Sequence, residues 1–414
     1  GGDHPGRGGL PVVQRALRHV VGEPGQRAAG DRVGLGQLGA HAVGPDAGDV
    51  VEVERVVEPP LLARAELAVA GLPREAFAAT TMTWMGWQGY ETPILAGTFL
   101  ADNDIDFQPT FIASNEEIIT KLQAGGIGKT DLITMYFGYL PLMAEGELLE
   151  PIDTGKIDQL SKLIPQFVAQ DAIRYQGNLM GVPWNWGSLP LMYDPAVVTS
   201  PPESWLDILK PEHQGKVAMV DDPLGNLLIW GTVVTGKPMG TILTKDEMVQ
   251  VIDKLIEIKT KHARAFFPSY GDMSDAFARN EVTVSAIGWE AVAVWTQAKG
   301  KTIKYTIPKE GTGMFMDCLC IPKDAPHPDL SYKMINHVVS AEPQKQFATE
   351  QSAGITNLDT VPLLPKELAE SYNYGDIDGF MQKARLQPVP PTESDGSVAT
   401  YDDFLNEYQR LSKA

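Results

Sequence analysis

The chain has 414 residues, and 34 Lys plus Arg against 53 Asp plus Glu give it a formal net charge of −19. This acidic balance argues against non-specific binding to nucleic acid or to an anionic membrane, because both need a basic surface. The length predicts two domains, two cysteines are too few for a disulfide framework, and no run of about 18 apolar residues indicates a transmembrane helix.

Residues 1–78 differ in composition from the rest of the chain. They contain no Lys and one aromatic residue, Phe77. Such a segment buries too little apolar surface to offset the entropy of ordering it, so we expect a disordered or non-native N-terminal extension. A flexible tail that binds a partner is the alternative. Ala76-Phe77-Ala78 has the small-x-small form of a signal-peptidase site, which we interpret as the remnant of a signal peptide.

From residue 80 onwards, short apolar runs alternate with helical patterns. The predicted strands, rich in Val, Ile, Met, Thr and Trp, are 81–86, 108–112, 131–135, 216–220, 282–287 and 316–321. The segments 114–117 and 244–247 have the spacing of capping boxes and open two helices, and 329–340 and 401–412 are amphipathic. This alternation predicts an α/β fold with mainly parallel sheets.

Motifs for catalysis or cofactor binding are incomplete. Gly128-Lys129-Thr130 resembles the end of a phosphate loop, but it follows a helix and precedes a strand, which is the reverse of the order that presents helix amides to phosphate. The seven His lack the spacing of a zinc site, and no Gly-x-Ser-x-Gly is present. Cys318 and Cys320 share one strand face and are interpreted as two buried thiols. The sequence therefore predicts no enzyme activity, no cofactor and no metal.

Aromatic residues and carboxylates recur where the predicted strands end. The set comprises Trp87, Tyr90, Tyr136, Trp184, Trp186, Asp221, Asp222, Trp289, Glu290, Phe315 and Asp317. Ligands of open α/β sheets bind beyond the carboxyl ends of the strands, aromatic faces attract cations, and carboxylates pair with ammonium protons. The pattern predicts a site for an organic amine, although the tryptophans could equally be core residues and Asp221-Asp222 a solvated turn.

A series of motifs extends over residues 80–414. It comprises Trp87-Gln88-Gly89-Tyr90, Ser114-Asn115-Glu116, Asp131-Leu132-Ile133, Gly181-Val182-Pro183-Trp184, Ser204-Trp205-Leu206-Asp207, Asp221-Asp222, Pro308-Lys309-Glu310-Gly311 and Phe315-Met316-Asp317. In order and spacing, this series resembles the periplasmic spermidine/putrescine-type solute-binding proteins of ABC importers.

The resemblance implies a two-lobed periplasmic-binding-protein fold (type II-like), with the ligand cleft between the lobes and multiple crossing segments. It places 80–190 and about 317–360 in lobe 1, and about 191–316 and 361–414 in lobe 2. It also implies a periplasmic monomer that binds no nucleic acid and delivers a small, polyamine-like organic amine to the transmembrane subunits of an ABC permease. By position, the residues that match ligand contacts of the family are Trp87, Tyr90, Tyr136, Asp222, Trp289, Phe315 and Asp317.

Three positions depart from the family pattern. The family often has Trp where Phe315 stands, an acid where Gly225 stands and a Tyr where Ala353 stands. A smaller amine, such as an amino acid or a betaine, is therefore an alternative ligand, and Glu290 is a candidate replacement acid. A ligand sensor for a chemoreceptor and an α/β enzyme are the remaining alternatives.

Overall fold

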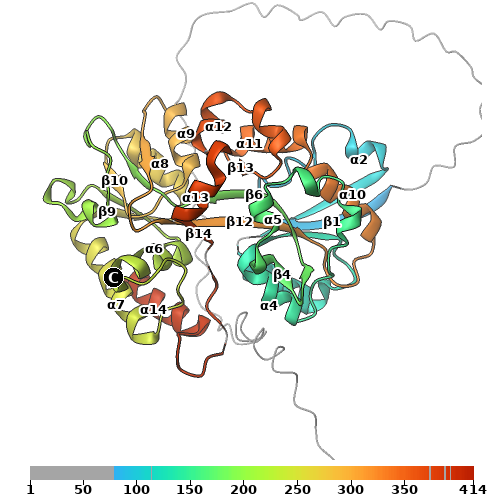
Figure 1. Cartoon of the computed structure of the whole chain (residues 1–414), viewed down its shortest axis with the longest axis horizontal. Helices are drawn as coiled ribbons and strands as arrows, with labels where there is room; N and C mark the ends of the chain where they lie inside the picture. The colour runs from blue at the N-terminus through green and yellow to red at the C-terminus, as the bar shows by residue number, and fades with distance from the viewer. Residues whose placement is uncertain (1–78, 113, 373, 387, 392) are drawn as a thin grey trace, which may run out of the picture. The chain divides into compact units, whose positions relative to one another are not determined.

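The computed structural model describes residues 79–112, 114–372, 374–386, 388–391 and 393–414. The predicted N-terminal extension, residues 1–78, lies outside these residues. Two large β-sheets organise the described part, and β12 runs across its centre in Figure 1. No helix of the described part is long and apolar enough to span a membrane.

The first sheet has the strand order β13-β6-β12-β3-β1-β2, and β14 also pairs with β12. Its strands are β1 (Thr80–Gly86), β2 (Ile105–Phe111), β3 (Leu132–Tyr136), β6 (Val182–Ser188), β12 (Thr312–Cys320), β13 (Gly354–Ile355) and β14 (Ala384–Leu386). A separate two-stranded sheet joins β4 (Arg174–Tyr175) to β5 (Asn178–Leu179). The accompanying helices are α2 (Phe99–Asp102), α3 (Asn115–Lys121), α4 (Leu140–Glu145), α5 (Pro165–Val168), α10 (Pro328–Val338), α11 (Ala341–Gln351), α12 (Lys366–Ser371) and α13 (Ile377–Lys383).

The second sheet has the order β11-β7-β10-β8-β9. Its strands are β7 (Leu191–Tyr193), β8 (Val217–Val220), β9 (Ala263–Phe267), β10 (Val284–Ser285) and β11 (Lys304–Thr306). The helices of this region are α6 (Pro223–Thr235), α7 (Lys245–Lys261), α8 (Tyr270–Ala278), α9 (Glu290–Ala298) and α14 (Tyr401–Lys413). The chain crosses between the sheets from β6 to β7 and returns from β11 to β12, so the fold has two lobes with crossing segments.

The sheets are mixed, so the prediction of mainly parallel sheets is wrong. β1 pairs in parallel with β2 and β3, and β8 pairs in parallel with β9 and β10. β12, however, is antiparallel to both β3 and β6, and β7 is antiparallel to β10 and β11. A strand that returns from the other sheet enters in the opposite direction, which local sequence patterns do not reveal.

The predicted helices form where their end signals stand. The Thr244 side chain accepts a hydrogen bond from the Glu247 amide, and the Glu247 carboxylate accepts one from the Thr244 amide, so the capping box of α7 is confirmed. α7 buries one apolar face, which packs against α6 and α14. The predicted buried thiols are also confirmed, because Cys318 and Cys320 are unpaired and fully buried.

Candidate ligand-binding site

Asp317 lies at the centre of a first group of predicted site residues. In β12 it stands opposite Tyr136 of β3 on one side and Asn185 of β6 on the other. The Tyr90 hydroxyl, from the turn after β1, donates a hydrogen bond to Asp317 Oδ2 at 3.0 Å. The Tyr90 ring also packs edge to face against Trp184, with a centroid distance of 5.0 Å. The fold therefore brings three of the predicted residues together: Tyr90, Tyr136 and Asp317.

The Asp317 side chain is poorly hydrated, since the residue is only 5% exposed. Burial raises the pKa of its carboxyl to about 6. The Tyr90 hydroxyl and the Asn185 amide lower this pKa, but by less than burial raises it. The structure gives it no ion pair with any described Lys, Arg or His. An ionised acid in such a place is costly unless a cation pairs with it.

Asp222 anchors a second group, at the start of α6. Its Oδ1 accepts from the Gly225 amide at 2.9 Å and so caps the helix, and its Oδ2 accepts from the Tyr270 hydroxyl at 2.7 Å. Burial raises the pKa of the Asp222 carboxyl, and the Tyr270 bond opposes this. A Cβ at Gly225 would stand 2.6 Å from Ile287 and 2.8 Å from the Asp222 carboxylate, so an acid at position 225 would displace this packing.

Aromatic rings connect the two groups. Trp289 packs against Phe315 at a centroid distance of 5.9 Å and against Tyr270 at 6.0 Å. Phe315 precedes Asp317 by two residues on β12, so the two side chains leave the same face of the strand. Gly187 makes this arrangement possible, because a Cβ there would stand 2.5 Å from the Phe315 ring and 2.8 Å from Trp289 Nε1.

The remaining aromatic and acidic candidates neighbour the two groups in different ways. Trp87 is half-buried in the turn after β1, and its carbonyl accepts from the Tyr90 amide at 3.0 Å. Trp184 and Trp186 are fully buried and belong to the core. Asp221 is exposed and accepts from the Tyr408 hydroxyl at 2.9 Å.

Glu290 does not join either group. It is 2% exposed at the first turn of α9 and accepts from the Ser188 amide at 3.0 Å, and also from the Ser188 hydroxyl. Ser188 ends β6, directly before the chain crosses to β7, so this pair holds α9 against a crossing segment. Burial raises the pKa of Glu290 to about 7, and the Ser188 bonds oppose the effect.

Two residues at the site were missed by the sequence analysis. Tyr270 opens α8 behind the N-cap Ser269, and that capping signal could have placed it near the end of β9. Asn185 stands between two tryptophans, and only its pairing with Asp317 on another strand reveals its position.

A carboxylate away from these groups connects α3 to α14. Glu116, in the first turn of α3, accepts hydrogen bonds from the Tyr139 and Tyr401 hydroxyls. Tyr401 begins α14, which the Lys245–Asp403 ion pair at 2.8 Å fastens to α7. Glu116 therefore ties a helix of the first-sheet region to one of the second-sheet region.

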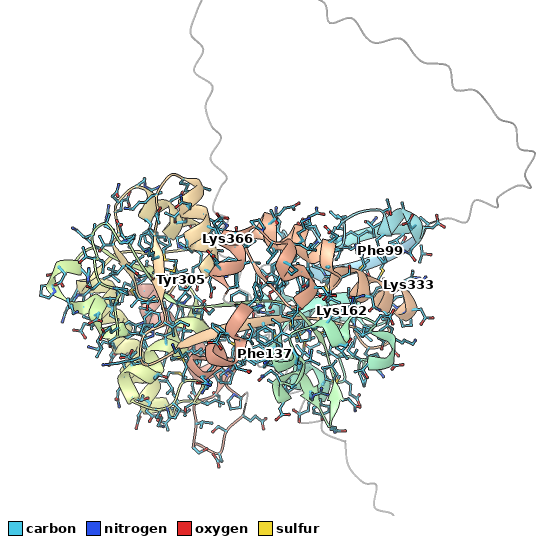
Figure 2. All side chains as sticks on the ribbon, turned by 45° about the horizontal axis from the view of Figure 1, so that its top comes forward. Phe99, Phe137, Lys162, Tyr305, Lys333 and Lys366 are labelled. Atoms are coloured by element: carbon cyan, nitrogen blue, oxygen red, sulfur yellow. The ribbon has the colours of Figure 1, made fainter. Side chains whose placement is uncertain are left out.

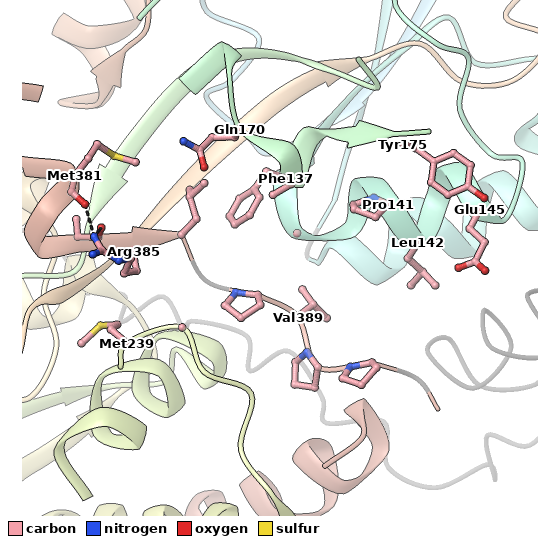
Figure 3. A pocket seen from close by; sticks show the side chains of 18 residues that line it. Phe137, Pro141, Leu142, Glu145, Gln170, Tyr175, Met239, Met381, Arg385 and Val389 are labelled. Atoms are coloured by element: carbon pink, nitrogen blue, oxygen red, sulfur yellow. Dashed lines mark hydrogen bonds between the residues drawn. The ribbon is translucent and has the colours of Figure 1, made fainter. Parts of the chain in front are cut away.

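A cavity of about 840 Å³ is lined in part by Phe137 and Gly138, and Gly138 lies against the ring of Tyr136. It is lined from α4, from the turn at Met239 and from the proline-rich segment 388–391, as Figure 3 shows. Phe137, near the middle of the described part in Figure 2, forms one wall. None of the seven predicted ligand contacts lines this cavity, so it is distinct from the two acidic groups.

Two lobes that share crossing strands and carry carboxylates and aromatic rings beside those strands characterise a solute-binding protein. Residues 95–373 match the family model of the bacterial extracellular solute-binding proteins, and the chain belongs to that family. The family resemblance seen in the sequence is thus confirmed.

Curated relatives and solved structures agree with this assignment. The chain is 26% identical over 311 residues to the putrescine-binding periplasmic protein PotF of Escherichia coli, covering 70% of this chain and 82% of the relative. It is 25% identical over 314 residues to the spermidine/putrescine-binding periplasmic protein of the same species, covering 75% and 87%. The substrate-binding protein PotD of a spermidine/putrescine ABC transporter from Streptococcus pneumoniae has the same fold, with a TM-score of 0.67 at 23% identity over 81% of this chain and 99% of that chain.

Proposed function

We propose that this protein captures a polyamine-like organic amine in the periplasm and delivers it to the permease of an ABC importer. The observation that carries the proposal is the pair of acids, Asp317 and Asp222, which have no described ion-pair partner. A series of aromatic contacts connects them: Phe315, two residues before Asp317, packs on Trp289, which packs on Tyr270, the hydrogen-bond partner of Asp222. The names of the curated relatives, which bind putrescine or spermidine, favour a polyamine over an amino acid or a betaine.

Each group has a separate task in this proposal. One ammonium of the ligand pairs with Asp317 and the other with Asp222, each contact contributing about 1.5–3 kcal/mol. Phe315 and Trp289 lie against the ammonium groups and add about 0.5–2 kcal/mol each through cation–π attraction. The hydroxyls of Tyr90 and Tyr270 orient the two carboxylates. Trp87 and Tyr136 complete the proposed set of ligand contacts.

The lobes move as units in this mechanism. We take 80–190 with about 317–360 as lobe 1, and about 191–316 with 361–414 as lobe 2. Helices α12 and α13 and strand β14, which accompany the first sheet, then form a segment that crosses back to the second sheet. Hinge bending at the crossings closes the lobes around the amine, and closure excludes water and strengthens the ion pairs.

The proposal requires capture without turnover, by a monomer, at one ligand per chain. Isothermal titration with putrescine and spermidine tests it, with glycine betaine, γ-aminobutyrate and maltose as comparison ligands. A true ligand at a hundredfold excess over its Kd stabilises the protein by about 2.7 kcal/mol. If only a sugar or a zwitterion binds, or if the amine is consumed during the titration, the proposed function is wrong.

A further inference from the structure

Asn185 is a buried amide without a protein partner. It is 1% exposed, and neither its Oδ1 nor its Nδ2 makes a hydrogen bond with a described residue. Asn357, another fully buried asparagine, shows the usual alternative: its Oδ1 accepts from the Asp359 amide at 2.9 Å and its Nδ2 donates to the Val339 carbonyl at 2.7 Å. Leaving a buried amide unsatisfied costs free energy, so something outside the chain is expected to satisfy that of Asn185.

The Asn185 amide lies beside the Asp317 carboxylate. Asn185 on β6 and Asp317 on β12 are directly opposite in the antiparallel register, so their side chains leave the sheet as neighbours. The Asn185 amide is near enough to lower the pKa of Asp317 and that of Tyr90, yet it forms no well-aligned hydrogen bond with either.

The acceptors around Asp317 can be counted. Its Oδ2 already accepts from Tyr90, which leaves Oδ1 for a ligand. A primary ammonium has three N–H donors, so one carboxylate oxygen cannot satisfy it. The Asn185 Oδ1 supplies a second, uncharged acceptor, and the Tyr90 hydroxyl oxygen can supply a third.

We propose that Asn185 is a further ligand-binding residue, whose Oδ1 accepts a second N–H of the primary ammonium that Asp317 holds. This inference rests on the proposed function and deepens it. Because a tertiary ammonium has a single N–H, the pair Asp317–Asn185 selects primary amines over N-methylated ones. Specificity at this end of the ligand then depends on the number of donors as well as on charge.

The test compares putrescine with N,N,N′,N′-tetramethylputrescine by isothermal titration, on the wild type and on Asn185→Leu. The variant is expected to bind putrescine about 10- to 100-fold more weakly, the range for a hydrogen bond to a charged group. Its affinity for the tetramethyl diamine should change by less than about threefold, since that ligand uses one acceptor only. The melting temperature of the ligand-free variant should be unchanged or higher, because the substitution removes an unsatisfied buried amide.

Trp184→Phe is the matched control. Its Nε1 is also buried and unpartnered, on the neighbouring position of the same strand, but this N–H is a donor only and cannot accept a hydrogen bond from the ammonium. This variant should keep the wild-type preference for the primary amine.

The outcomes separate the two hypotheses. If the wild type binds neither diamine, the proposed function fails. If it binds putrescine and Asn185→Leu retains the same preference, the inference about Asn185 is overturned while the proposed function stands. Asn185→Val serves as a second variant with high strand propensity. If both variants lose thermal stability without ligand, the amide has a structural role and the inference is again overturned.

Discussion

The substitution Asp317→Asn distinguishes a ligand-binding carboxylate from a structural one. Burial raises the pKa of Asp317 from 3.8 to about 6. A carboxyl whose folded pKa exceeds its unfolded value binds more protons when folded, so its ionisation destabilises the ligand-free protein as the pH rises above 4 and does so fully above 6. A shift of about two pKa units corresponds to about 3 kcal/mol at pH 7.

Asp317→Asn removes that cost and keeps an oxygen that can accept from Tyr90. We therefore expect the free energy of unfolding of the ligand-free protein at pH 7 to rise, by up to about 3 kcal/mol. Affinity for putrescine should fall by about 2–5 kcal/mol, because the ammonium loses its charged partner. Urea unfolding and isothermal titration on the same preparation measure both quantities.

Asp131→Asn provides the control. Asp131 is 1% exposed, but it accepts from the Thr83 amide at 2.8 Å and from the His327 amide at 2.9 Å, so it is a structural acid. Its replacement should lower stability and leave affinity almost unchanged. If Asp317→Asn behaves like Asp131→Asn, the bound amine is not the partner of Asp317 and the reasoning is refuted.

Three other predictions follow from charges and hydrogen bonds described above. Affinity for putrescine should fall about tenfold between pH 7 and pH 5, as protons compete for Asp317 near its pKa of about 6, and a flat titration series across this range would contradict it. Glu290→Gln should raise the melting temperature at pH 8 more than at pH 5, because burial raises the pKa of Glu290 to about 7 and its ionisation disfavours folding at high pH. An equal fall in melting temperature at both pH values would show that the Ser188 hydrogen bonds outweigh the cost of burial. We expect the hydrogen bond from Tyr401 to Glu116, which joins the two proposed lobes, to contribute to lobe closure. Tyr401→Phe should then weaken putrescine binding about tenfold, whereas Tyr139→Phe, which removes a bond to Glu116 within lobe 1, should not. Equal effects of the two substitutions in titration would argue against this role.

Local signals in the sequence predict which segments form helices and strands, whereas pairing with distant strands decides how long each strand is and in which direction it runs. The strand predicted at 81–86 and the helix that begins after Thr244 depend on alternation and capping, which neighbouring residues determine. The strand predicted at 282–287 is reduced to Val284–Ser285, because only that part pairs with β7 and β8. Short strands such as β7 have no signal of their own and form because their partners are in place.

The same division applies to the site. Carboxylates and aromatic residues at strand ends predict Asp317 and Asp222, whereas nothing in the local sequence distinguishes Asn185 from a core residue. Its role depends on the register between β6 and β12, which are distant in sequence. The sequence shows that Gly225 replaces an acid of the family pattern. Its consequence, the close packing of Ile287 and the Asp222 carboxylate around Gly225, is a property of the folded chain.

The burial of both thiols makes this protein a convenient scaffold for a fluorescent sensor. Cys318 and Cys320 are the two cysteines of the chain, both are fully buried, and burial raises the pKa of each thiol, so a maleimide dye finds almost no thiolate on the native protein. A single cysteine introduced at the exposed Glu145, on the rim of the 840 Å³ cavity, would take the dye alone. Emission from that position would report whether the packing of the segment 388–391 against α4 changes when solute binds.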